Sequence, residues 1–268
     1  MSDWSISVFE LENARGLPAP LLEIHYTEEE TGIEWQITTS GTRAYLVRMN
    51  SRPSGDALDP ENEAADSHFM IRRVLAALLL GGSGLFHAQA RGRTLMQGVE
   101  GEIVWRCMLE PFQVRGELGL TSLESNPPRV IDWYTAIIGN TFLRRAAEDA
   151  HTALSWPWEA FVYIYIYRGF EWITKGFGMS WDDLARELSV PRSQFKELKK
   201  MANYESGVRH ASSSGTRMRA NLENSATWVT GLFEAINVAR SRIDSSFNRM
   251  SSEEIAAAVL KAATHPFL

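Results

Sequence analysis

The period of the hydrophobic pattern changes part-way along this chain of 268 residues. In the first part, apolar side chains alternate with polar ones, as they do from Trp4 to Glu12 and from Leu22 to Tyr26. Alternation of this kind is typical of strands that bury one face. From Ile131 onward, apolar residues recur every three or four positions, which is the spacing of an amphipathic helix. The change in period predicts a sheet-containing part followed by a helical part.

A turn-rich stretch at residues 121–129, which holds two adjacent prolines, marks the change. We therefore predict an α+β fold with a domain boundary at residue 125. Residues 1–125 are expected to form a mixed β-sheet with one helix, and residues 126–268 an α-helical bundle. The strands of the first domain are expected at residues 4–12, 22–26, 33–37, 44–49, 84–90, 102–109 and 112–118, and its helix at residues 63–80.

The helical domain is expected to begin with one long helix over residues 131–154. The next helix includes the run from Phe161 to Tyr167, which has strand propensity taken alone. We still predict helix there, because the run is flanked by helical segments and is apolar on all sides, as in the central helix of a bundle. Ser180 to Asp183 resemble a capping box at the start of a short helix. Later helices are expected at residues 191–203, 217–245 and from residue 251, with a loop at residues 204–216.

The charge is distributed unevenly. The net charge is −6, with ten basic and 18 acidic side chains in residues 1–125 and 17 against 15 in residues 126–268. Residues 192–219 stand out, because they carry seven basic side chains against two acidic ones. An acidic protein does not attract polyanions over its whole surface, so any contact with nucleic acid has to be local.

Several functional classes are excluded by the residues that are missing. Cys107 is the only cysteine, so no disulfide can form within the chain, and one cysteine with six scattered histidines offers no zinc-ligand spacing. No nucleotide-binding, dinucleotide-binding or hydrolase motif occurs, so we predict neither a metal nor a cofactor. The chain lacks a signal-like start and any apolar stretch long enough for a membrane span, which predicts a cytoplasmic protein without membrane contact.

Residues 183–198 have the apolar skeleton of a helix-turn-helix, with Ser189 where a turn glycine is usual. In that interpretation Arg192, Ser193, Gln194 and Lys196 would face the major groove of DNA. The same skeleton also occurs in helical proteins that never bind DNA, because two short helices at a steep angle need the same packing residues.

Residues 199–221 form the second candidate site. A loop rich in glycine and serine leads there into a helix start, where free backbone N–H groups together with arginines would suit a phosphate or carboxylate. His210 could act as an acid or base near neutral pH. The alternative is a purely structural role, with the arginines paired to glutamates and His210 bonded to loop carbonyls. The candidate ligand-binding residues are Asn203, Arg209, His210, Ser212, Arg217 and Arg219.

The run from Trp158 to Tyr163, together with Glu171-Trp172, Ser180-Trp181, Ala202-Asn203 and Val208 to Ala211, resembles the methylamine-utilisation protein J (MauJ) family. The resemblance covers about residues 130–245. The helical half of that family is in turn similar to HEPN domains, so the resemblance implies a HEPN-like bundle. It implies no settled biochemical task.

HEPN ribonucleases resemble one another through an arginine, four to six intervening residues and then a histidine. Counting back from His210, those positions hold Asn203, Tyr204 and Glu205, and Arg209 is directly adjacent instead. We therefore expect an accessory or interaction protein, not an enzyme, which binds an anionic ligand, nucleic acid or protein partner through residues 199–221. A homodimer through the helical bundle is a further expectation. The alternatives are a metal-independent ribonuclease that uses His210 as its catalytic residue and a helix-turn-helix DNA-binding regulator.

Overall fold

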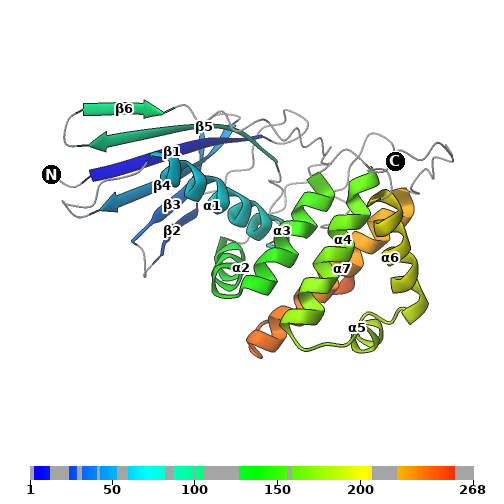
Figure 1. The fold of residues 1–268 in the computed structure, drawn as a ribbon. Coiled ribbons are helices and arrows are strands. Elements are labelled where there is room, and N and C mark those ends of the chain that lie inside the picture. The colour runs from blue at the N-terminus through cyan, green and yellow to red at the C-terminus, as the bar shows by residue number, and fades with distance from the viewer. Residues whose placement is uncertain are drawn as a thin grey trace, which may run out of the picture. The chain divides into compact units, whose positions relative to one another are not determined.

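The computed structural model describes residues 3–12, 24–28, 32–40, 43–52, 60–81, 87–98, 101–105, 127–155, 159–206 and 222–256. The chain divides into two compact units, and the boundary between them falls inside a helix, after Ile131. The first unit holds a sheet and a long helix, and the second is helical, so the predicted α+β class is confirmed (Figure 1).

A six-stranded sheet in the order β2-β3-β4-β1-β5-β6 forms the centre of the first unit. Every pair of neighbouring strands is antiparallel, so the prediction of a mixed sheet is wrong. The first strand of the chain lies in the middle of the sheet, between β4 and β5. Its register with β5 shifts between Val8 and Glu10. The strands are β1 (Asp3–Glu12), β2 (Ile24–Thr27), β3 (Glu34–Ser40), β4 (Arg43–Arg52), β5 (His87–Gly98) and β6 (Gly101–Trp105).

One predicted strand is much shorter than the observed one, a second can be compared only in part, and a third cannot be compared. β5 continues to Gly98, beyond the predicted end at residue 90, because it pairs with β1 along most of its length. This pairing overrides the weak strand propensity of its polar, glycine-containing sequence. β6 is described only as far as Trp105, and the predicted strand at residues 112–118 lies outside the described residues.

Helix α1 (Pro60–Leu80) covers one face of the sheet (Figure 1). Its apolar stripe is buried, as the helical spacing of Met70, Val74 and Leu78 predicts. Polar groups also meet beneath it. The hydroxyl oxygens of Ser7 on β1 and Ser67 on α1 lie 2.8 Å apart, and the fully buried Arg48 donates to Ser67 at 3.4 Å. The contact between sheet and helix therefore combines an apolar core with a buried polar cluster.

The second unit is built from α2 (Pro127–Gly139), α3 (Thr141–Ser155), α4 (Glu159–Gly176), α5 (Trp181–Glu187), α6 (Arg192–Ser206) and α7 (Leu222–Ile243), of which the start of α2 belongs to the first unit. A further helix begins at residue 252 and is described as far as residue 256. The prediction of a single helix over residues 131–154 is wrong. The side-chain oxygen of Asn140 accepts from the backbone N–H of Phe142 at 3.1 Å and of Leu143 at 3.0 Å, which starts α3 as a separate helix.

Helix α4 is the central helix of this unit, with α3, α6 and α7 packed around it (Figure 1). The strand-prone run 161–167 is helical, as predicted from its context. Two glycines bring its neighbours close. A Cβ atom added at Gly169 would meet Leu232 of α7 at 2.7 Å, and one added at Gly176 would overlap the side chain of Phe142 on α3. Glycine at these positions lets the backbone of α4 approach both helices.

Candidate functional site

Helices α5 and α6 form the helix-turn-helix-like pair that the sequence predicts. The Ser180 side chain accepts from the backbone N–H of Asp183 at 3.0 Å, and the Asp183 carboxylate accepts from the backbone N–H of Ser180 at 3.0 Å. These two bonds are the predicted capping box. The Ser180 hydroxyl also donates to the Asp183 carboxylate at 2.6 Å, and this bond, followed by the one from the Ser180 backbone N–H, holds the pKa of the Asp183 carboxyl below its usual value.

The turn between the two helices requires an unusual backbone conformation at Ser189. Its φ angle is +53°, in the left-handed region that favours glycine. This is the position at which the sequence has serine in place of the usual turn glycine. The apolar skeleton of the pair is largely buried, with Leu184, Phe195 and Leu198 in the core.

Helix α6 exposes its basic and polar side chains. Its buried positions Phe195, Leu198 and Ala202 recur at helical spacing. The exposed positions are Ser193, Gln194, Lys196, Glu197, Lys199, Lys200 and Asn203. The ammonium group of Lys200 pairs with Glu197 at 2.7 Å, whereas Lys196 and Lys199 have no ion-pair partner in the described part of the chain. Two lysines of α6 are therefore available to an anionic partner.

Arg192, at the start of α6, is held within the α5–α6 pair. Its guanidinium lies 3.1 Å from a carboxylate oxygen of Asp182 and 5.6 Å from the ring centre of Trp181. Trp181 in turn stacks on Tyr167 of α4, with ring centres 5.5 Å apart. Burial, followed by the nearby Glu171, raises the pKa of Tyr167. Arg192 thus joins α5 to α6, and its side chain is less available to a partner than the sequence suggested.

One of the six predicted ligand-binding residues is described. Asn203 lies on α6 with an exposed side chain that takes part in an interaction. The other five, Arg209, His210, Ser212, Arg217 and Arg219, lie outside the described residues. The structure extends α6 to Ser206, into the predicted loop, which lengthens the helix that precedes this segment.

A second cluster of functional side chains lies between α3 and α4, around the carboxylate of Asp149. The Asp149 side chain is 4% exposed, and Arg168 donates to both of its oxygens, from Nε at 2.8 Å and from Nη2. The indole N–H of Trp172 donates to the same carboxylate at 3.1 Å. The hydrogen bond to Asp149 raises the pKa of Arg168 above its ordinary value, against the opposite effect of burial. Asp149 therefore fixes two side chains of α4 from a buried position on α3.

Two exposed cations flank the ring of Trp172. The Arg145 guanidinium carbon lies 4.6 Å from the ring centre, and the Lys175 ammonium lies 5.6 Å from it. Among the described residues, neither cation has an ion-pair partner. The ring of Phe142, which is 38% exposed, lies 6.4 Å from that of Trp172. Cations and aromatic rings thus alternate on the surface of these two helices.

This cluster was not predicted from the sequence, and Trp172 is half-buried within it. The sequence contains the charged and aromatic residues of the cluster, Arg145, Asp149, Arg168, Trp172 and Lys175. Their spacing indicates a common surface only once α3 and α4 are known to pack side by side.

Helix α3 also contains the arginine-to-histidine spacing that residues 199–221 lack, because five residues separate Arg145 from His151. Six positions along a helix turn the second side chain by about 120° from the first. This spacing therefore places Arg145 and His151 on different faces of α3, whereas Arg144, which has six residues between it and His151, lies within about 20° of His151 around the helix.

No group of three or more metal-binding side chains occurs in the part of the chain that the structure describes. Within the same residues, no helix is both long and apolar enough to cross a bilayer. No protein-family model, no curated protein and no solved structure matches this chain.

Proposed function

We propose that the chain is a non-enzymatic accessory protein that binds the phosphate backbone of a nucleic acid through α6 and residues 199–221, which begin within that helix. The exposed face of α6 carries the proposal. Its apolar side is buried while Lys196 and Lys199 point away from the core without an ion-pair partner among the described residues. Lysines in this arrangement bind phosphates as point charges.

The sequence beyond α6 extends the same charge. Arg209, Arg217 and Arg219 follow within 20 residues of Lys199, with Glu205 as the only acidic residue between Lys199 and Arg219. Because the rest of the chain is acidic, this local excess would direct a polyanion to one surface. The resemblance to MauJ proteins and to HEPN-like bundles adds a class of fold in which contact with RNA is known.

The lack of the ribonuclease spacing within residues 199–221 supports a binding role for that segment. Counted forward from Arg209, the positions at which the ribonuclease spacing places histidine hold Ser214, Gly215 and Thr216. The serine and threonine hydroxyls do not titrate near neutral pH as histidine does, and glycine has no side chain to titrate. Catalysis would then depend on His210 beside Arg209, outside the spacing.

The second candidate is a DNA-binding regulator, which the turn geometry favours. The left-handed backbone of Ser189 and the buried skeleton of α5 and α6 are the features that a helix-turn-helix needs. Ser193 and Gln194 are exposed at the start of α6, where a recognition helix contacts base edges.

The test compares two double variants with equal changes in net charge. Binding of a labelled RNA or DNA is measured by fluorescence anisotropy over a range of salt concentrations. In Lys196→Glu with Lys199→Glu we expect a loss of affinity and a fall of about 2 in the slope of log affinity against log salt, one for each lost phosphate contact. The control is Arg242→Glu with Arg249→Glu, which reverses two exposed arginines on and after α7.

Equal affinity in the two double variants would exclude α6 as the binding surface. If binding is specific for a duplex sequence and Gln194→Ala relaxes that specificity, the regulator is correct. If the protein cleaves RNA and His210→Ala abolishes cleavage, the ribonuclease is correct and the non-enzymatic role is refuted.

A further inference from the structure

We propose that α3 and α4 carry a binding surface for single-stranded nucleic acid, on which unpaired bases stack. This Trp172 surface consists of Phe142, Arg145, Tyr165, Arg168, Trp172 and Lys175. It lies on different helices from the α6 surface, and α4 separates α3 from α6 (Figure 1). The inference goes beyond the proposed function, because it assigns a second surface and the form of nucleic acid bound there, and it can fail independently.

The cations of the surface are available for phosphates. Arg145 and Lys175 are exposed, and neither has an ion-pair partner among the described residues. Arg168 is neutralised by Asp149 and is also affected by the nearby Glu148. Glu148 on α3 would oppose an anion here, as would Glu171 one turn before Lys175. The effect of Glu148, however, falls on Arg168, which is already paired. The charge that remains for a ligand is that of Arg145 and Lys175.

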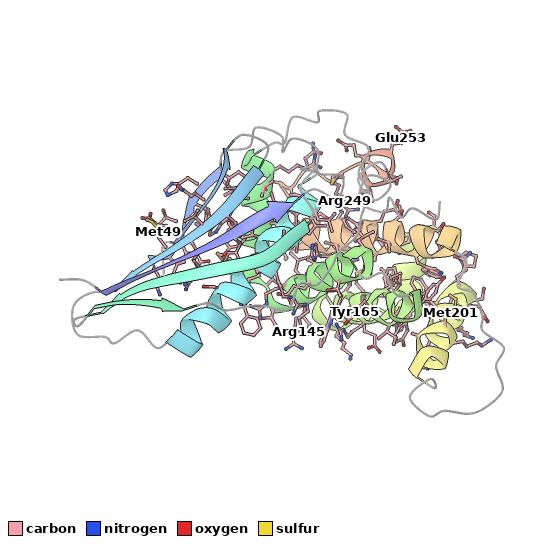
Figure 2. All side chains as sticks on the ribbon, turned by 90° about the horizontal axis from the view of Figure 1, so that it is seen from above. Met49, Arg145, Tyr165, Met201, Arg249 and Glu253 are labelled. Carbon is pink, nitrogen blue, oxygen red and sulfur yellow. The ribbon has the colours of Figure 1, made fainter. Side chains whose placement is uncertain are left out.

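The aromatic rings are interleaved with these cations. Phe142 and Trp172 face one another at 6.4 Å between ring centres, and the Arg168 guanidinium carbon lies 4.8 Å from the ring centre of Tyr165. Arg145 and Tyr165 extend from the same side of the α3–α4 pair (Figure 2). Aromatic faces and guanidinium planes are the groups on which bases stack in proteins that bind single strands without sequence preference.

The surface is ordered in advance by Asp149. This buried carboxylate holds the guanidinium of Arg168 and the indole of Trp172, and the indole ring in turn supports the guanidinium of Arg145. A ligand that binds here would lose less side-chain freedom on this surface than on isolated surface arginines.

Unpaired nucleotides fit this surface better than the other polyanions. In a duplex the base faces are already stacked on one another, so they cannot contact Phe142 or Trp172. An acidic peptide would satisfy Arg145 and Lys175 but would leave the exposed aromatic rings without a role. A single strand supplies both phosphates and free aromatic faces.

The experiment compares two strands that have equal charge. Affinity is measured by anisotropy for a thymidine oligomer of about 12 nucleotides, within the usual site size, and for the same backbone with abasic sites. We expect the abasic strand to bind at least about fivefold more weakly, the lower limit for the loss of one stacked base. Arg145→Glu with Lys175→Glu should weaken binding of the thymidine oligomer at least about tenfold at low salt, whereas Arg242→Glu with Arg249→Glu should change it by less than about threefold.

Equal binding of the two strands would overturn the proposal, because it would show that bases do not contribute. It would also be overturned if the two charge-reversal variants behaved alike, or if a poly-glutamate of equal charge bound as tightly as the oligomer. These results leave the α6 proposal standing if its own variant loses affinity. Conversely, normal duplex binding by the α6 variant together with the expected Trp172-surface results would refute only the α6 site. No binding of any strand by the unmodified protein would refute both.

Discussion

The ion pair between Asp149 and Arg168 should respond very differently to the loss of either partner. In Arg168→Ala, the carboxylate of Asp149 would lose its guanidinium partner in a site where it is 4% exposed, although the Trp172 indole N–H still donates to it. Breaking a buried ion pair by removing one partner costs about 3–5 kcal/mol. In Asp149→Ala, the Arg168 side chain is 43% exposed and can turn to water. The loss is then limited to charge-assisted hydrogen bonds, about 1.5–3 kcal/mol.

The difference in unfolding free energy between the two variants is measured by urea unfolding, monitored by a spectroscopic signal from the helical unit. We expect Arg168→Ala to destabilise that unit by about 2 kcal/mol more than Asp149→Ala, which is the difference between the midpoints of the two ranges. Acidification provides a second readout. Burial without a cation raises the pKa of a carboxyl above its unfolded value, so its destabilising charge is present above that pKa and disappears as the pH falls through it. The deficit of Arg168→Ala should therefore shrink on acidification. Equal costs, or a larger cost for Asp149→Ala, would refute this reasoning.

Three further substitutions test the packing and the turns of the helical unit. Gly169→Ala should destabilise it by about 1–3 kcal/mol, since the added methyl overlaps α7, whereas Gly139→Ala, with nothing within 4 Å of the added atom, should have little effect on the urea midpoint. Ser189→Gly should stabilise the protein by about 0.5–1 kcal/mol, because glycine relieves the left-handed strain at a smaller entropic cost; an unchanged or lower melting temperature would contradict this. Ser180→Ala should lower the melting temperature at about pH 6 and less at about pH 3, since the lowered pKa of Asp183 contributes stability above the ordinary carboxyl pKa that is lost as the pH falls through the lowered value. An equal decrease at both pH values would show that the Asp183 charge has no part in it.

The sequence predicted those parts of the fold whose signals are local. The capping box at Ser180, the glycine-like position of Ser189 and the apolar stripe of α1 depend on neighbours in the sequence, and the structure contains each of them. The break at Asn140 was missed, because the apolar spacing continues through it and only the side-chain bonds to the α3 backbone reveal a new start. The antiparallel arrangement of the sheet was missed because strand order depends on pairing between distant segments.

The candidate sites differ in the same way. The basic residues of α6 lie within one short segment of the sequence, so the face of the helix that exposes them could be predicted from the helical period. The Trp172 surface could not, since Arg145 and Trp172 are 27 positions apart and meet only when α3 packs on α4. The binding role predicted for Arg209 and His210 stays a prediction, because both lie outside the described residues.

The place of Asp149 beneath α4 has a consequence for how this surface can change by mutation. One carboxylate holds Arg168 and Trp172 together, so a substitution at Asp149 alters the core contact of α3 with α4 and the outer face of α4 at the same time. Variants selected for altered binding should therefore seldom change Asp149 alone. They should instead accumulate at Arg145 and Lys175, which contact the indole without taking part in the buried ion pair, and can be exchanged at little cost to folding.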